Sequence, residues 1–383
     1  MRTRTALLGL ALASLGTGLA VGCSSPTATS ATPSLQVVTA PLSTSLVTAQ
    51  GAWAIAVMGG SAASGNNFWQ LFVRPAGASR WSLVTPPGVA DNGGLIAGGA
   101  STSMLIGFRP SQGLTFSPLA ASSDVGRTWA PGLLDADLAD VPDAMAVGPS
   151  GRTLALLHDG SIEAAATAGA ASAGQWSQLT TLAALAASAP GRSCGLVAVN
   201  AVSFGPNDTP MAAGSCLRRG VAGVFADAAG TWQAAGPALP AGFGGDQVQV
   251  LGLGSAVVAN KGGGNVALLL AGRSLLAAWS EGTQWTVSAP VAASGVTASG
   301  FGPGGSVWLL LSDGRAETIT GAGGSWAALP PVPPRTATLA PGAGGGYDAL
   351  AVSGSRLTVW RLAGAAWAKV QVINVPIEYG SSS

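Results

Sequence analysis

Charged residues are scarce in this chain of 383 residues, of which only 9% are Asp, Glu, Lys or Arg. Basic and acidic residues nearly balance, at 17 against 16. A protein that neutralises nucleic-acid phosphates needs an excess of Lys and Arg on one surface, and this balance does not supply it. We therefore expect no nucleic-acid partner.

Residues that bind metals or act as catalytic bases are also few. The chain has one histidine, His158, and three cysteines with no close pair, so the ligand spacing of a zinc site is missing. We expect no cofactor. A Ca²⁺ site is the remaining alternative. One acidic stretch has carboxylates that could bind the ion: Asp135, Asp137, Asp140 and Asp143. That stretch lacks the glycine and the terminal glutamate of an EF-hand loop, so we interpret it as a solvated connection.

Long apolar runs are absent after residue 21, where no stretch approaches the ~20 residues that a membrane helix needs. Apolar residues occur instead in short packets, such as 154–157 and 307–311. The chain separates them with 57 glycines and 24 prolines, which favour tight turns over long helices. The predicted fold class is therefore all-β.

The N-terminus has the form of a secretory signal. Arg2 and Arg4 precede an apolar stretch, and a linker rich in Ser, Thr, Pro and Ala follows Cys23. Leu19 to Cys23 resembles the lipobox of bacterial lipoproteins, although Ala20 stands where that family usually has leucine. The resemblance implies a signal peptide over 1–22, a lipidated Cys23 with a linker over 23–34, and one domain over 35–383. It places the protein on the extracytoplasmic face of the cell membrane.

The two other cysteines are expected to pair. If Cys23 carries lipid, Cys194 and Cys216 are the only thiols left in the mature chain. In an oxidising compartment such a pair is expected to form a disulfide rather than two free thiols.

Seven tryptophans recur along the chain at intervals of 41 to 56 residues. A small-residue turn precedes most of them, and Gly-Pro and Asp-Gly turns recur upstream, as at Gly302-Pro303 and Asp313-Gly314. Periods of this length in an all-β sequence indicate the four-stranded blades of a β-propeller, most simply seven, with six or eight as alternatives. We expect the tryptophans to pack between blades: Trp81, Trp129, Trp176, Trp232, Trp285, Trp326 and Trp367.

One repeat carries a more specific pattern over residues 122–129. Its defined positions are Ser122, Asp124, Gly126, Thr128 and Trp129, and they match the Asp-box, Ser-x-Asp-x-Gly-x-Thr-Trp. The chain thus resembles the sialidase-like propellers, known as Asp-box or BNR-repeat proteins. The resemblance implies a hairpin between the third and fourth strands of a blade, on the face away from an active site.

The resemblance does not bring a recognisable catalytic set. Sialidases use a tyrosine nucleophile, and this chain has only Tyr347 and Tyr379. We interpret His158 as a hairpin-edge histidine bonded to the backbone, and Arg218-Arg219 as a solvated hairpin end, with an anion-binding pair as the alternative.

The favoured function is a monomeric, non-catalytic binding or scaffold protein that holds a protein or glycan partner at the envelope. A divergent sialidase-like glycoside hydrolase or carbohydrate-binding propeller is the alternative, and it predicts paired carboxylates about 5–10 Å apart in a central funnel.

Overall fold

The computed structural model divides the chain into two compact units, residues 1–36 and 37–383. It describes residues 44–59, 67–86, 91–98, 102–110, 119–131, 142–256, 264–342 and 346–376, all of which belong to the second unit. Cys23 and the segments 1–22 and 23–34 lie outside the described residues. No helix in the described ranges has the length and apolar character needed to cross a bilayer.

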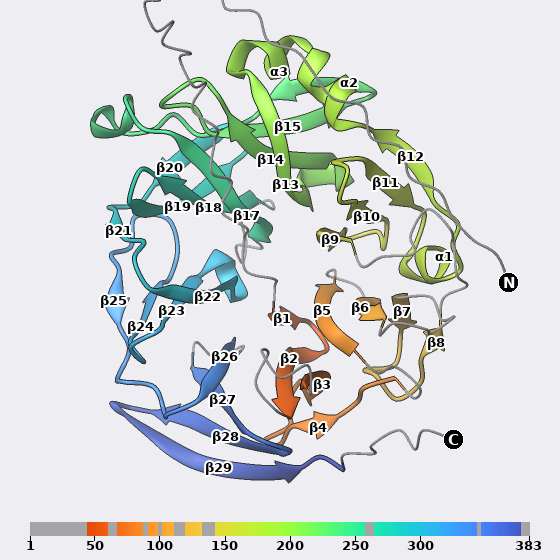
Figure 1. Ribbon diagram of the computed structural model, residues 1–383, viewed down its shortest axis with the longest axis vertical. Coiled ribbons are helices and arrows are strands. Elements are labelled where there is room, and N and C mark those ends of the chain that lie inside the picture. The colour runs from red at the N-terminus through yellow and green to blue at the C-terminus, as the bar shows by residue number, and fades with distance from the viewer. Residues whose placement is uncertain are drawn as a thin grey trace, which may run out of the picture. The chain divides into compact units, whose positions relative to one another are not determined.

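The second unit is a seven-bladed β-propeller, which confirms the predicted fold class and blade number (Figure 1). Each blade is an antiparallel sheet whose four main strands are consecutive in the chain, from blade 1 (β1 to β4) to blade 7 (β26 to β29). Most of the first strands contact the first strand of a neighbouring blade around the ring. The first strands are β1 (Ser45–Thr48), β5 (Asp91–Gly98), β9 (Ala144–Val147), β13 (Leu196–Phe204), β17 (Val248–Ala256), β22 (Val296–Phe301) and β26 (Thr336–Pro341).

The second strand of each blade is mostly buried where its side chains are described, whereas the third strand of blade 7 is mostly not. The second strands are β2 (Gly51–Gly59), β6 (Met104–Pro110), β10 (Thr153–Leu156), β14 (Pro210–Cys216), β18 (Gly264–Ala271), β23 (Val307–Leu311) and β27 (Tyr347–Ser353). The third strands are β3 (Asn67–Pro75), β7 (Leu119–Ser122), β11 (Ile162–Ala165), β15 (Gly223–Ala228), β19 (Ser274–Glu281), β24 (Ala316–Ile319) and β28 (Arg356–Ala363).

The outer strands are short in six blades and long in blade 7. Six of them have two to four residues: β4 (Ser82–Leu83), β8 (Ala130–Pro131), β12 (Ser177–Thr180), β16 (Thr231–Ala234), β20 (Gln284–Val287) and β25 (Ala327–Ala328). In blade 5 the additional β21 (Val291–Ala292) pairs with β19. The outer strand of blade 7, β29 (Ala366–Asn374), has nine residues.

The turn chemistry read from the sequence explains where strands end. The Gly302-Pro303 turn begins the short 3-10 helix η5 (Pro303–Gly305). The N–H of Gly302, which precedes this helix, donates to the carbonyl of Ser306 at 2.7 Å, and Gly304 has a φ of 67°. In the Asp-Gly hairpins only the glycines take positive φ, 81° at Gly160 and 82° at Gly314. The aspartates act through their side chains instead, since Asp159 accepts from the Ser161 N–H at 2.8 Å.

The seven marker tryptophans lie on, or directly before, the outer strands. Each belongs to the apolar cluster that its blade shares with the preceding blade. Four of their indole N–H groups also donate to a carbonyl just after the outer strand of that preceding blade. The pairs are Trp129 with Val84, Trp285 with Ala235, Trp326 with Ala289, and Trp367 with Pro330, at 2.8 to 3.0 Å.

The ring closes between blades 1 and 7 without an exchanged strand, because every blade is built from consecutive strands. An apolar cluster from both blades fills this junction, with Ala54 and Phe72 on one side and Leu350 and Val359 on the other. Gly59 also donates a backbone hydrogen bond of 2.9 Å to the carbonyl of Gly354. The first and last blades of the chain are thus neighbours.

Candidate binding surface

Blade 4 presents an exposed apolar side chain on a turn between its second and third strands. We call residues Leu217 to Gly220 the Leu217 turn. Leu217 is 57% exposed, more than the other exposed large hydrophobic residues of the described chain. Arg218 and Arg219 follow it and are exposed as well, and Val197 on β13 is 37% exposed. An aliphatic side chain thus stands in water beside two guanidinium groups.

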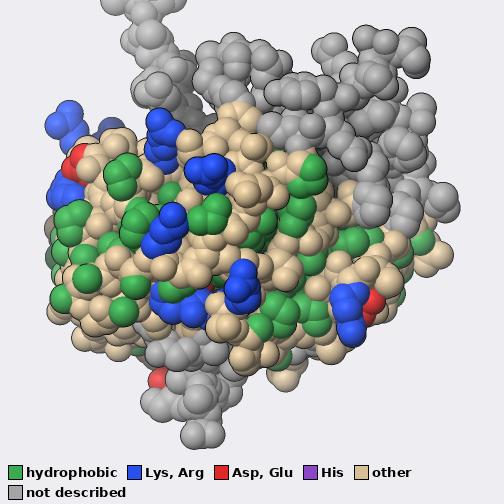
Figure 2. Space-filling model, turned by 90° about the horizontal axis from the view of Figure 1, so that it is seen from below, with side chains coloured by type: hydrophobic (Ala, Val, Ile, Leu, Met, Phe, Trp, Pro, Cys, Tyr) green, Lys and Arg blue, Asp and Glu red, His purple; other side chains and the backbone are tan. Residues whose placement is uncertain are grey.

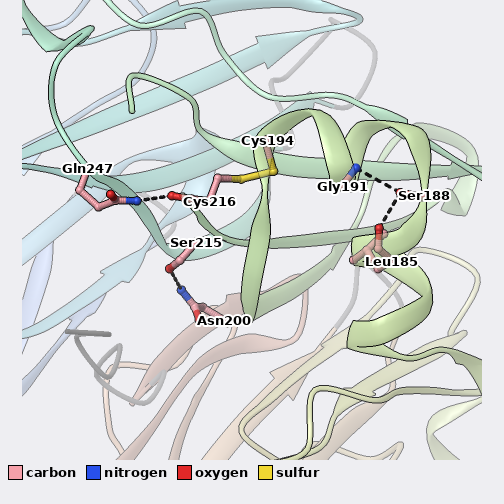
Figure 3. The surroundings of a disulfide bond; sticks show 8 residues. All are labelled: Leu185, Ser188, Gly191, Cys194, Asn200, Ser215, Cys216 and Gln247. Carbon is pink, nitrogen blue, oxygen red and sulfur yellow. Dashed lines mark hydrogen bonds between the residues drawn. A yellow bond between two sulfur atoms is a disulfide. The ribbon is translucent and has the colours of Figure 1, made fainter. Parts of the chain in front are cut away.

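The Leu217 turn is fixed at both ends, and Figure 3 shows the disulfide bond at its first end. The expected disulfide between Cys194 and Cys216 joins the end of α3 (Ala189–Cys194) to the end of β14. Beyond it, the backbone N–H of Leu217 donates to Gly195 and that of Arg218 to Cys194, each at 2.9 Å. The Leu217 side chain therefore projects from a framework that is already ordered.

The far end of the turn is tied to the connection that leads into blade 5. Gly220 has a φ of 71°, and its N–H donates to the carbonyl of Asp246 at 2.8 Å. The Arg219 side chain donates to the carbonyl of Gly245 at 2.8 Å. Gln247 donates through its amide to the carbonyl of Cys216. The turn is therefore held by two blades rather than by its own hairpin.

Two short helices, α2 (Leu182–Ala187) and α3, support the turn from the connection between blades 3 and 4. Thr181 caps α2 by accepting from the Ala184 N–H at 3.1 Å, and Ser188 caps α3 by accepting from the Gly191 N–H at 3.2 Å. Gly195 ends α3 in the left-handed conformation with a φ of 68°. The helices were not predicted, although they account for the longest interval between the marker tryptophans. A third helix, α1 (Ala168–Ser172), lies in blade 3.

The Asp-box residues form the hairpin between β7 and β8 of blade 2. Asp124 accepts from the Thr128 N–H at 2.9 Å and from the Thr128 hydroxyl at 2.7 Å, while Ser122 accepts from the Gly126 N–H at 3.0 Å. Gly126 has a φ of 75°. Because this hairpin joins third and fourth strands, it lies on the face opposite the Leu217 turn, which joins second and third strands.

The hydrogen bonds from Thr128 lower the pKa of Asp124 from 3.8 to about 2, first through its backbone N–H and then through its hydroxyl. The carboxylate's contribution to the turn is therefore fully present above the unfolded value and is lost as pH falls through the folded value. In Thr128→Ala the backbone donor remains, so we expect the pKa of Asp124 to rise only part of the way to 3.8. An NMR titration of the carboxyl carbon measures this, and an unchanged pKa would contradict the role of the hydroxyl.

The candidate nucleophile Tyr347 is buried between blades. Its hydroxyl lies 2.5 Å from the Thr318 hydroxyl, and burial raises the pKa of Tyr347. Its neighbour Asp348 is 2% exposed and accepts from Trp81 and Arg361. Both residues therefore act in the packing of the ring. Tyr379 lies outside the described residues.

His158 does not have the partner expected from the sequence. Its side chain is exposed, and Nδ1 lies 3.4 Å from Oδ2 of Asp143 rather than on a backbone group. The hairpin leaves the ring free in water, where the neighbouring carboxylate can reach it. Asp135, Asp137 and Asp140 lie outside the described residues, within which no group of three or more His, Cys, Asp or Glu could hold a metal ion.

Comparisons with known proteins support the fold. No protein-family model matches the chain, and no curated protein matches it either. A protein from Lactobacillus plantarum has a similar structure, with a TM-score of 0.50, 10% identity, and coverage of 84% of this chain and 96% of that one. YCF48 from Cyanidioschyzon merolae has a TM-score of 0.44 and 14% identity, with 86% and 94% covered. A putative 6-phosphogluconolactonase from Bacteroides uniformis has a TM-score of 0.46 and 12% identity. The match covers 84% of this chain and 96% of that one. Of these three, the protein from Lactobacillus plantarum reaches a TM-score of 0.50, and at 10% identity its similarity shows the fold alone.

Proposed function

We propose that this protein is a lipid-anchored, non-catalytic propeller on the extracytoplasmic face of a bacterial cell membrane, and that it binds a partner protein. The anchor is inferred from the signal-like segment 1–22 and from Cys23. The disulfide is consistent with an oxidising compartment. Binding is inferred from one observation: Leu217 is 57% exposed on a turn that a disulfide and two blades hold in place.

The exposed leucine and the neighbouring arginines of the Leu217 turn indicate the kind of partner segment that would bind there. An ordered apolar side chain can be buried at little entropic cost, and adjacent arginines can form bidentate bonds with carboxylates. Arg192 on α3 is a further exposed cation beside the disulfide. We therefore propose a partner segment with an apolar side chain next to Asp or Glu. The relation to Asp-box propellers is also a proposal, and it rests on the turn at 122–129.

Leu217→Asp tests the binding role. The substitution places a carboxylate in the apolar contact and next to the proposed acidic partner, so capture of the envelope partner should fall at least about tenfold. Ala327→Asp is the matched control, because it also puts a carboxylate at an exposed aliphatic position, on β25 of blade 6. Equal capture by wild type and Leu217→Asp in a quantitative pull-down would contradict the proposal.

Cys23→Ala tests the anchor separately. Without the thiol no diacylglyceryl thioether can form, so the variant should leave the detergent phase in a phase-partition assay, while the wild type stays in it. Intact-mass measurement of the wild type should show the added lipid. A wild-type mass equal to that of the unmodified polypeptide would rule out lipidation at this residue.

A further inference from the structure

Closure of the ring brings together two blades with an unusual charge. Blades 1 and 7, residues 44–86 and 330–376, contain six basic residues and one acidic residue, a net charge of +5. The other residues after position 22 contain nine basic and fifteen acidic residues, a net charge of −6. The near-neutral total therefore hides an unequal distribution of charge between these two blades and the rest of the sequence. The separation appears only in the folded ring, since the two blades lie at opposite ends of the described chain.

The cations gather on the outer rim of these blades, along β28 and β29 and the turn before β4. Figure 2 faces this rim and shows basic side chains across its middle, with few acidic ones. Arg80, Arg356 and Lys369 are exposed there, and none forms an ion pair with a described carboxylate. The acidic residue of the two blades, Asp348, is buried and already paired with Arg361. We call Arg80, Arg356 and Lys369 the cationic rim.

Apolar side chains stand among these cations. Val370 and Val372 on β29 are 41% and 38% exposed and alternate along the strand with Lys369 and Gln371. They are two of the four large hydrophobic residues that are exposed in the described chain. Cations beside exposed aliphatic groups are the combination that binds the interface of an anionic bilayer, where headgroup charge and acyl boundary meet.

The edge of β29 is poorly suited to an added strand from another protein. Its pairing with β28 is interrupted by a bulge between Val359 and Trp360, and Lys369 lies at that bulge. Bulges and lysines are the devices that keep open sheet edges from pairing. A bilayer surface, unlike an added strand, can contact this edge without pairing with the backbone of β29.

We propose that the cationic rim, with Val370 and Val372, docks the propeller edge-on against an anionic phospholipid bilayer. The proposal rests on the distribution of charge in the folded ring and does not depend on the proposed lipid anchor. Edge-on docking leaves the Leu217 turn of blade 4 accessible to its partner.

Vesicle binding tests the proposal in the full chain carrying Cys23→Ser, which removes lipidation. Vesicles of phosphatidylcholine alone are compared with vesicles containing about one third phosphatidylglycerol. Each rim cation near an anionic surface contributes about fivefold to the partition coefficient, so Arg356→Gln with Lys369→Gln should weaken binding to the anionic vesicles about 30-fold. Added salt should weaken wild-type binding because it screens the surface charge.

The matched control is Arg127→Gln with Arg273→Gln, which removes two exposed cations from blades 2 and 5. It changes the net charge equally and should reduce binding less than about threefold. Residues 1–22 are present in every variant, so any contribution they make cancels in the comparison.

An equal loss in the control would show diffuse attraction and overturn the proposal, as would equal binding to both kinds of vesicle. Displacement from the vesicles by soluble polyglutamate at lower charge concentration would assign the rim to an acidic polypeptide instead, which also overturns it. Because the assay uses Cys23→Ser, its failure would leave the lipid anchor untouched, and failure of the anchor would leave the vesicle result standing.

Discussion

Replacing Asp348 with asparagine is expected to lower the free energy of unfolding by about 3–5 kcal/mol. The Asp348 carboxylate is 2% exposed and lies at the junction that closes the ring. It accepts from the Arg361 Nε at 2.8 Å and from the Trp81 indole at 2.8 Å, and the Arg74 Nε lies 3.3 Å away. Asparagine keeps the size of the side chain but leaves two guanidinium groups at the junction without a compensating charge.

Asp313→Asn is the control for this experiment. Asp313 also pairs with an arginine, at 2.7 Å from Arg315, but both side chains are more than half exposed. Exposed pairs add little to stability, so this variant should unfold at nearly the wild-type denaturant concentration. Equal and small effects of the two substitutions in urea unfolding would show that Asp348 does not hold the closure.

Removing the disulfide between Cys194 and Cys216 is also expected to lower the free energy of unfolding strongly. Cys194 and Cys216 are 22 residues apart, and closing a loop of that length restricts the unfolded chain by about 3 kcal/mol. Cys194→Ala with Cys216→Ala should lose stability of that order. It should also weaken partner capture, because α3 and the Leu217 turn are no longer joined.

A reducing agent provides the internal control for the disulfide. It should destabilise the wild type toward the level of the double variant and leave the double variant unchanged. A wild-type midpoint that does not respond to complete reduction, verified by thiol counting, would contradict the contribution of the bond.

The blades could be predicted from the sequence because their signals are local. Most marker tryptophans follow a turn of small residues, so the turn and the start of the outer strand are marked within a short stretch of chain. The contact with the preceding blade spans about one repeat, as Trp285 shows by bonding to Ala235 50 residues earlier. The seven blades were predicted on this basis.

The Leu217 turn could not be predicted, because its features depend on contacts made elsewhere. In the sequence, Leu217 continues an apolar packet after Cys216 and reads as a strand residue. The helices beneath it were detectable in principle, since Thr181 and Ser188 are N-cap residues and Gly195 is a C-terminal glycine. Their short length and alanine-rich sequence gave no periodic apolar face.

The closing junction and the cationic rim were hidden for a different reason. In the sequence, Asp348 stands out only as the neighbour of Tyr347, and its partners Trp81 and Arg74 lie more than 260 residues earlier. The charge of blades 1 and 7 likewise averages out along the chain. Both features follow from which blades become neighbours, a property of the closed ring.

The central claim is that the propeller binds a partner through the Leu217 turn, and hydrogen–deuterium exchange of the complex tests it most directly. With the captured envelope protein bound, we predict slower exchange at residues 195–197 and 217–220 and no change at the Asp-box turn on the opposite face. Protection confined to the Asp124 turn or to other blades, with residues 217–220 exchanging as in the free protein, would contradict the proposed binding surface.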